Sequence, residues 1–187
     1  MKSLTEKIKT DESIIMKEDA ERKLIFIEIE NRMNKKIKEI KKLYQASYDG
    51  GYSVNFHNKC DNIPNTLVLI KSEGQRRFGG FTPIPWKSEG GYMKDRNMIT
   101  FVFSLDNKKV YNLLNPDCAA VYHDKNSGPC FGDGRDIAID GNPIIENKLY
   151  TYQSSYDYKG DSHSLSECDF EPKGKVLDYE VFQIIFN

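Results

Sequence analysis

The chain changes composition sharply near residue 48 of 187. Residues 1–44 contain no glycine and no proline, and they hold 12 Lys and Arg, nine Asp and Glu and two aromatic residues. All 13 glycines, all seven prolines and 20 of the 22 aromatic residues come later. Because glycine and proline interrupt helices and mark turns, the first part of the chain favours helix, whereas the rest favours short strands joined by turns.

The first segment predicts one long helix over residues 20–44. Its apolar positions are three or four residues apart, so they share one helix face. They are Phe26, Ile29, Met33, Ile37, Ile40 and Tyr44. This face can pack on the rest of the molecule or pair with a second helix as a coiled coil. Fewer than three regular heptads favour packing on the parent domain or on a partner. We expect the lysines between residues 35 and 42 to be solvated.

The later segment has the pattern of a β protein. Runs rich in Val, Ile, Phe and Tyr predict strands at residues 66–71, 98–104, 109–113, 118–122, 136–139 and 180–186. The turn at 106–108 makes the second and third of these a hairpin. A short helix beginning near Ser53 places Phe56 and Cys60 towards the core. The predicted fold is mainly β, of the α+β class: a two-sheet antiparallel β-sandwich with a few short helices and one long N-terminal helix.

Charge and hydropathy exclude several classes of function. The formal net charge is −1, so no whole-chain positive field attracts nucleic acid or an anionic membrane. No apolar run approaches the ~20 residues that a membrane-spanning helix needs. The N-terminus lacks the apolar stretch of a secretory signal, so we expect a cytoplasmic protein without a transmembrane segment.

No motif in the sequence predicts catalysis, a metal or a cofactor. Four cysteines without a CxxC pair favour free, buried thiols over a disulfide scaffold or a zinc site. The spacing of His57 and Cys60 would allow a base and a nucleophile to meet on one helix, but Cys60 is expected to face the core. The Gly-x-Gly at 132–134 precedes a strand, so it predicts a tight turn and not a nucleotide site. We expect no enzyme, no metal and no cofactor.

Seven blocks of the sequence, in order, resemble a TLDc domain. They are SYDG at 47–50, FHNKCD at 56–61, TLVLIKS at 66–72, FGGFT at 78–82 with Trp86, FVFSL at 101–105, GPCFG at 128–132 with DIAI at 136–139, and DYEVFQI at 178–184. The resemblance spans residues 43–186 and implies the same two-sheet sandwich. It divides the chain into an N-terminal helical extension, coiled-coil-like in pattern, at 1–43, and a TLDc domain at 44–187.

The resemblance also implies a function. TLDc proteins lack an accepted catalytic mechanism; several are linked to resistance against oxidative stress, and several bind the vacuolar proton pump (V-ATPase). We therefore expect a non-catalytic protein-interaction module, with the V-ATPase as the leading partner. An architectural component of a cytoskeletal or ciliary assembly is the alternative. A peroxide scavenger or other enzyme using Cys60 is the third hypothesis.

The residues expected to contact a partner lie in the polar and glycine-bearing turns. They are Asp49, His57, Asp61, Gly79, Gly80, Gly132, Asp133, Gly134, Arg135 and Asp136. Each also has a structural interpretation. The aspartates can cap turns, and the glycines can allow close packing or a positive φ.

Overall fold

The computed structural model describes residues 13–133, 135–146, 148–161, 165 and 174–187. The helices in this part are α2 (Asp19–Met33), α3 (Ala46–Asp49) and α4 (Ser53–Cys60). The strands are β1 (Ile37–Gln45), β2 (Thr66–Ser72), β3 (Arg77–Thr82), β4 (Gly91–Lys94), β5 (Phe101–Ser104), β6 (Lys109–Leu113), β7 (Ala119–His123), β8 (Ser127–Phe131), β9 (Ile137–Asp140), β10 (Leu149–Tyr150), β11 (Tyr156–Asp157) and β12 (Val176–Phe186).

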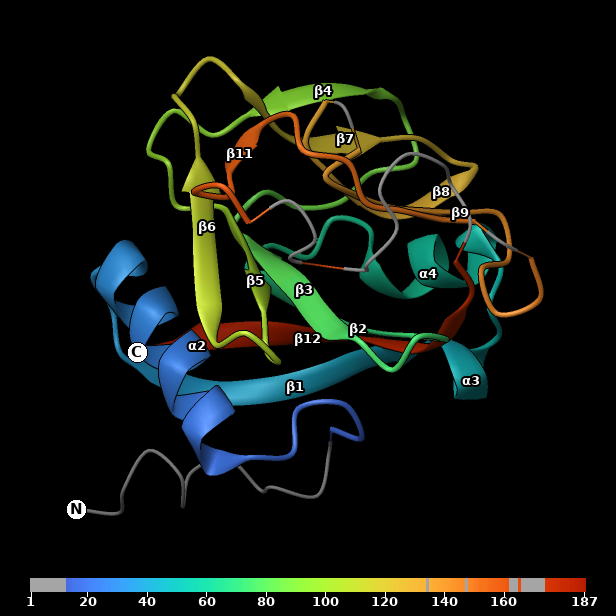
Figure 1. The fold of residues 1–187 in the computed structure, drawn as a ribbon, viewed down its shortest axis with the longest axis horizontal. Coiled ribbons are helices and arrows are strands. Elements are labelled where there is room, and N and C mark those ends of the chain that lie inside the picture. Colours follow the sequence, from blue (N-terminus) through green and yellow to red (C-terminus); the bar gives the residue numbers. More distant parts are fainter. Residues whose placement is uncertain (1–12, 134, 147, 162–164, 166–173) are drawn as a thin grey trace.

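Within the described residues the strands form two antiparallel sheets (Figure 1). The larger has seven strands in the order β1-β12-β2-β3-β5-β6-β11, and the smaller has five in the order β10-β9-β8-β7-β4. The predicted mainly β, two-sheet antiparallel fold is confirmed, as is the β5–β6 hairpin. The glycine pair in the middle of β3 lowers its strand propensity, which is why the runs of strand-forming residues did not include it.

Two apolar clusters lie on opposite faces of the larger sheet. The cluster between the sheets includes Val68, Val102 and Phe131, together with Phe56 and Cys60 of α4. The prediction that Phe56 and Cys60 face the core is confirmed, because both are fully buried. The second cluster lies between the other face of this sheet and α2. The molecule therefore has three layers, of which the larger sheet is the middle one.

The long N-terminal helix is not confirmed. Helix α2 begins at Asp19 but ends at Met33, where Asn34 adopts the left-handed conformation with φ of 50°. Asparagine tolerates this conformation, which closes the last helical turn. The remaining apolar positions, Ile37, Ile40 and Tyr44, belong instead to strand β1, which pairs with β12. Packing of Phe26 and Ile29 on the sheet accounts for the helical part of the pattern.

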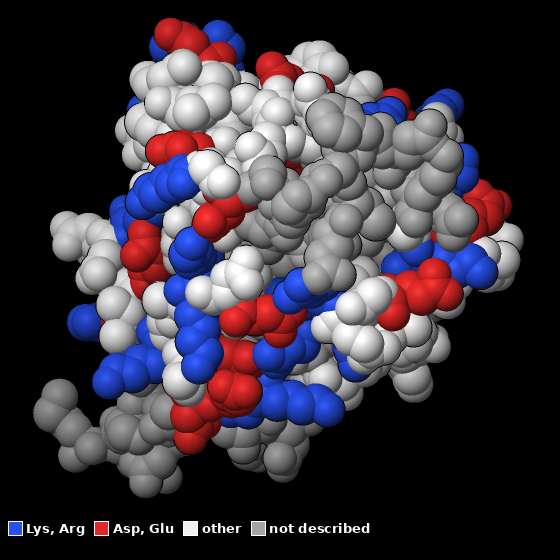
Figure 2. All heavy atoms as spheres, in the orientation of Figure 1, with Lys and Arg blue, Asp and Glu red and all other residues white. Residues whose placement is uncertain are grey.

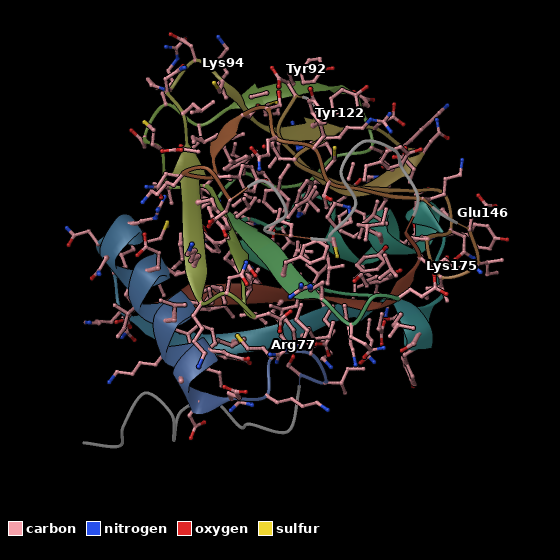
Figure 3. All side chains as sticks on the ribbon, viewed as in Figure 1. Arg77, Tyr92, Lys94, Tyr122, Glu146 and Lys175 are labelled. Carbon is pink, nitrogen blue, oxygen red and sulfur yellow. The ribbon has the colours of Figure 1, made fainter. Side chains whose placement is uncertain are left out.

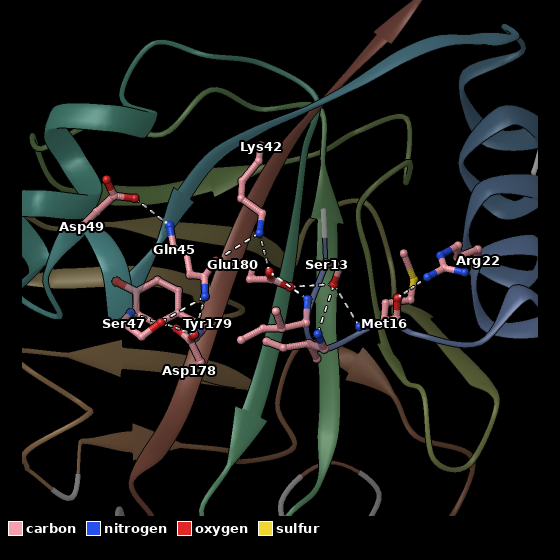
Figure 4. Close-up of polar contacts among 12 residues, drawn as sticks. Ser13, Met16, Arg22, Lys42, Gln45, Ser47, Asp49, Asp178, Tyr179 and Glu180 are labelled. Carbon is pink, nitrogen blue, oxygen red and sulfur yellow. Dashed lines mark hydrogen bonds and ion pairs between the residues drawn. The ribbon is translucent and has the colours of Figure 1, made fainter. Parts of the chain in front are cut away.

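The segment before α2 is held on the sheet by one buried carboxylate (Figure 4). The Ser13 hydroxyl donates to Oε2 of Glu180 at 2.6 Å, and the amide of Ile14 donates to Oε1 at 3.1 Å. The Lys42 ammonium binds the same Oε1 at 2.8 Å. Glu180 is fully buried in β12, so these partners supply the donors that a buried charge requires.

Candidate functional site

Large apolar side chains are exposed at the end of the sandwich where α3 and α4 lie. We call Tyr48, Tyr52, Val54, Ile145 and Leu177 the end surface; their exposed fractions are 88, 57, 57, 65 and 44%. Figure 3 shows Glu146 and Lys175 at this end, far from Tyr92 on β4. An exposed apolar group of this kind is typical of an interaction site.

Hydrogen bonds hold the segments that carry the end surface. Asp178 accepts from the Ser47 amide at 3.0 Å and from its hydroxyl at 2.5 Å, which fixes α3 on β12 (Figure 4). The Ser53 amide donates to the carbonyl of Gly141 at 3.1 Å, which joins α4 to the loop before Ile145. The backbone that carries the end surface is therefore fixed by hydrogen bonds to the rest of the fold.

His57 and Asp61, two of the predicted contact residues, form a pair one helical turn apart. His57 Nδ1 lies 2.7 Å from Oδ1 of Asp61, and Nε2 lies 3.0 and 2.9 Å from the carbonyls of Asp124 and Ser127. All three contacts are to oxygen atoms, and together they fix the orientation of the ring. His57 is buried. Its contact with the Ser127 carbonyl connects α4 to the start of β8. Asp61 also accepts from the exposed Ser88 hydroxyl at 2.7 Å.

Ser127 also connects His57 to Arg135, a third predicted contact residue. The Ser127 hydroxyl donates to Oδ1 of Asp140 at 2.6 Å, and Arg135 Nη1 donates to Oδ2 of the same carboxylate at 2.7 Å. The Arg135 guanidinium also lies 4.7 Å from the centre of the Tyr150 ring. A string of polar contacts thus runs from Arg135 to His57 and on to Asp61.

Asp136 is the centre of a separate buried turn. Its carboxylate accepts from the amides of Ser154, Ser155 and Tyr156 at 3.0, 2.9 and 3.2 Å. Gly132 has φ of 81°, and a Cβ there would lie 1.9 Å from Oδ2 of Asp136. Asp133 accepts from the hydroxyls of the first two serines at 2.5 and 2.9 Å. The structural interpretation of Gly132 and Asp136 as turn residues therefore holds.

The remaining predicted residues do not join these groups. Asp49 lies at the end of α3, where it accepts from the Gln45 amide at 2.9 Å and pairs with Lys59 at 3.2 Å. Gly79 and Gly80 are buried in β3, where a Cβ would meet the Val68 carbonyl at 1.9 Å and the Phe131 ring at 2.6 Å. Gly80 therefore allows close packing between the two sheets, and Gly79 allows β3 to approach β2 closely. Gly134 lies outside the described residues.

Burial raises the pKa of Asp136 to about 6 from the ordinary 3.8, against the three amide donors that lower it. Between pH ~4 and ~6 the folded chain therefore retains a proton that the unfolded chain has lost. This contribution to stability is present below that window and is lost as the pH rises through it. We expect the free energy of unfolding of the natural chain, minus that of Asp136→Asn, to be larger at about pH 4.5 than at about pH 7.5. Urea unfolding at both pH values measures it, and a constant difference would contradict the expectation.

The cysteines in the described part are free. Burial raises the pKa of the Cys60 thiol well above its usual range and that of Cys130 to about 12. Both ring nitrogens of His57 are bound to oxygen atoms, so the ring is not placed as a base for Cys60.

The described residues contain no group of His, Cys, Asp and Glu arranged to hold a metal ion. None of their helices has the length and apolar character of a membrane-spanning helix. Cys168 lies outside the described residues.

Sequence reasoning missed the buried carboxylates of β12, Asp178 and Glu180. Both stand in a strongly apolar run, DYEVFQIIF, at a spacing of two, which places them on the same face of the strand. An acidic side chain in such a run is a signal for a buried partner. Their partners, Ser47 and Ser13, are more than 130 residues away, so the sequence carried no sign of them.

A family model described as the TLDc domain matches residues 9–185, which is nearly the whole chain. No curated protein matches the chain. The match begins well before β1, so it includes α2 and the segment held by Glu180.

Proposed function

Because the chain belongs to the TLDc domain family, we propose that it is a non-catalytic module that binds a large protein complex, and that this complex is the V-ATPase. The proposal includes a contribution to oxidative-stress resistance that is exerted through the partner and not through chemistry of the chain itself.

The end surface carries this proposal. Tyrosine is among the residues enriched at protein interfaces, and Tyr48 and Tyr52 are both more than half exposed. Hydrogen bonds from Ser47 and Ser53 already order the backbone that carries them. A preformed surface loses little conformational entropy on binding, which favours affinity.

The state of the thiols supports a binding role over the third hypothesis. A thiol nucleophile needs a lowered pKa and access to solvent. Cys60 is fully buried and its pKa is raised, first by burial and then by the nearby Asp61. Peroxide reduction at this thiol is therefore disfavoured.

Replacing three residues of the end surface by serine tests the proposal. The triple variant Tyr48→Ser/Tyr52→Ser/Val54→Ser should reduce the V-ATPase recovered by the purified chain at least ~10-fold, because interface aromatics carry much of the binding free energy. Since all three side chains are exposed, the thermal midpoint should change little. Affinity capture followed by blotting for pump subunits measures the loss.

A matched control lies on β4, away from the end surface (Figure 3). Tyr92→Ser/Met93→Ser on β4 also removes exposed apolar side chains, and it should leave recovery of the pump unchanged. Absence of pump subunits from the natural chain's eluate, or equal recovery by both variants, would overturn the proposal. Recovery of a cytoskeletal polymer instead would favour the architectural alternative.

A further inference from the structure

Strand β1 forms an edge of the larger sheet. It pairs with β12 on one side, and no strand of the described residues pairs with its other side. Its register is regular from Glu39 to Lys42, between irregularities at Ile37/Glu39 and Lys42/Tyr44. An open strand edge presents amide and carbonyl groups that can bind one more strand.

Carboxylates already occupy the amides at the two ends of β1. The Ile37 amide donates to Oε1 of Glu30 at 2.9 Å, and the Gln45 amide donates to Oδ2 of Asp49 at 2.9 Å. These contacts close the ends of the strand. The open stretch therefore lies between them, over the regular residues.

Basic side chains are concentrated in β1 and the two residues before it, although the chain has no net positive charge. Residues 35–42 contain five lysines and one acidic residue, Glu39. Lys36 pairs with Glu30 at 2.7 Å and Lys42 with Glu180 at 2.8 Å. The other three, Lys35, Lys38 and Lys41, are exposed. Figure 2 shows basic and acidic side chains interleaved over the face that it presents.

We propose that the outer edge of β1 binds an extended acidic segment of a partner protein as an additional strand. Backbone hydrogen bonds would provide affinity, and the lysines would select acidic side chains. A second copy of this edge would bring like charges together, which opposes self-pairing. Nucleic acids and anionic lipids would meet the lysines but would not form strand hydrogen bonds. This site is separate from the end surface and extends the proposed function.

A designed peptide tests the edge directly. A fluorescent peptide of about ten residues with alternating Glu and Val should bind the chain at low salt and raise its fluorescence anisotropy. The same peptide with two central valines changed to proline lacks two of its amide donors and should bind at least ~10-fold more weakly. A Lys and Val peptide should not bind. In NMR spectra of the natural chain, the acidic peptide should slow hydrogen exchange of amides between residues 38 and 44.

Charge reversal on the chain completes the test. Lys38→Glu/Lys41→Glu should weaken binding of the acidic peptide at least ~10-fold, while Lys87→Glu/Lys125→Glu, at other exposed lysines, should not. Equal binding of the proline peptide, or protection of amides outside β1, would overturn the proposal. So would binding of RNA or anionic vesicles through these lysines without slower exchange in β1. The NMR result on the natural chain decides the question if charge reversal lowers stability.

Discussion

Replacing Gly79 by alanine is expected to destabilise the fold by at least ~3 kcal/mol. The alanine Cβ would lie 1.9 Å from the carbonyl oxygen of Val68 and 3.0 Å from the Phe103 ring. The carbonyl belongs to the neighbouring strand β2, so relief requires the sheet itself to move. Urea unfolding followed by tryptophan fluorescence measures the loss through Trp86, which is buried between the sheets.

The control for this substitution is Gly74→Ala, in the turn between β2 and β3. A Cβ there would meet only the Ser72 hydroxyl oxygen, at 3.8 Å, which is an ordinary contact. The free energy of unfolding should change by less than ~1 kcal/mol. Equal effects at the two glycines would show that β3 accommodates a side chain and that the close approach is not required.

Asp136→Ala should destabilise the chain by about 4 kcal/mol at neutral pH. It leaves three buried amides, of Ser154, Ser155 and Tyr156, without their acceptor. Each unsatisfied buried donor costs about 1–3 kcal/mol. Removing the carboxylate also removes the free-energy cost of burying it, which offsets part of that sum. Thermal and urea unfolding provide the measurement.

Asp117→Ala is the matched control for Asp136→Ala. This carboxylate is 69% exposed and pairs only loosely with Lys94 and Arg96, at 3.3 and 3.6 Å. Its loss should change stability by less than ~0.5 kcal/mol. A small effect at Asp136 as well would mean that water replaces the carboxylate in the turn.

The β-rich part of the fold was predictable because its strands are apolar runs bounded by turns. Runs such as 66–71 and 180–186 are almost continuously apolar, which is typical of strands buried on both faces. They lie in β2 and β12. The stretch from Ile37 to Tyr44 was not predictable in this way. Its lysines and glutamate suit a helix, and its three-and-four spacing continues that of α2. Pairing with β12, more than 130 residues away, determines that it forms a strand.

In the candidate site, too, contacts between residues close in sequence were predictable, and contacts between distant segments were not. His57 and Asp61 are four residues apart on one helix, so their contact could be expected from the sequence. The three amides around Asp136 come from residues 18 to 20 positions later, across a loop that carries no regular pattern. The end surface depends on α3, α4, the loop containing Ile145 and the start of β12 lying side by side, which only the folded topology establishes.

The place of β12 has a consequence for how the chain matures during synthesis. This strand lies between β1 and β2, so the larger sheet has a gap until residues 176–186 have left the ribosome. Until then, β1 and β2 each expose the edge that β12 later covers. Helix α2 also lacks the part of its packing surface that Phe182 and Ile184 of β12 provide. Folding of this sheet is therefore late and dominated by contacts between distant segments. Nascent chains stalled before residue 176 should depend on chaperones, whereas those that expose the whole chain should not.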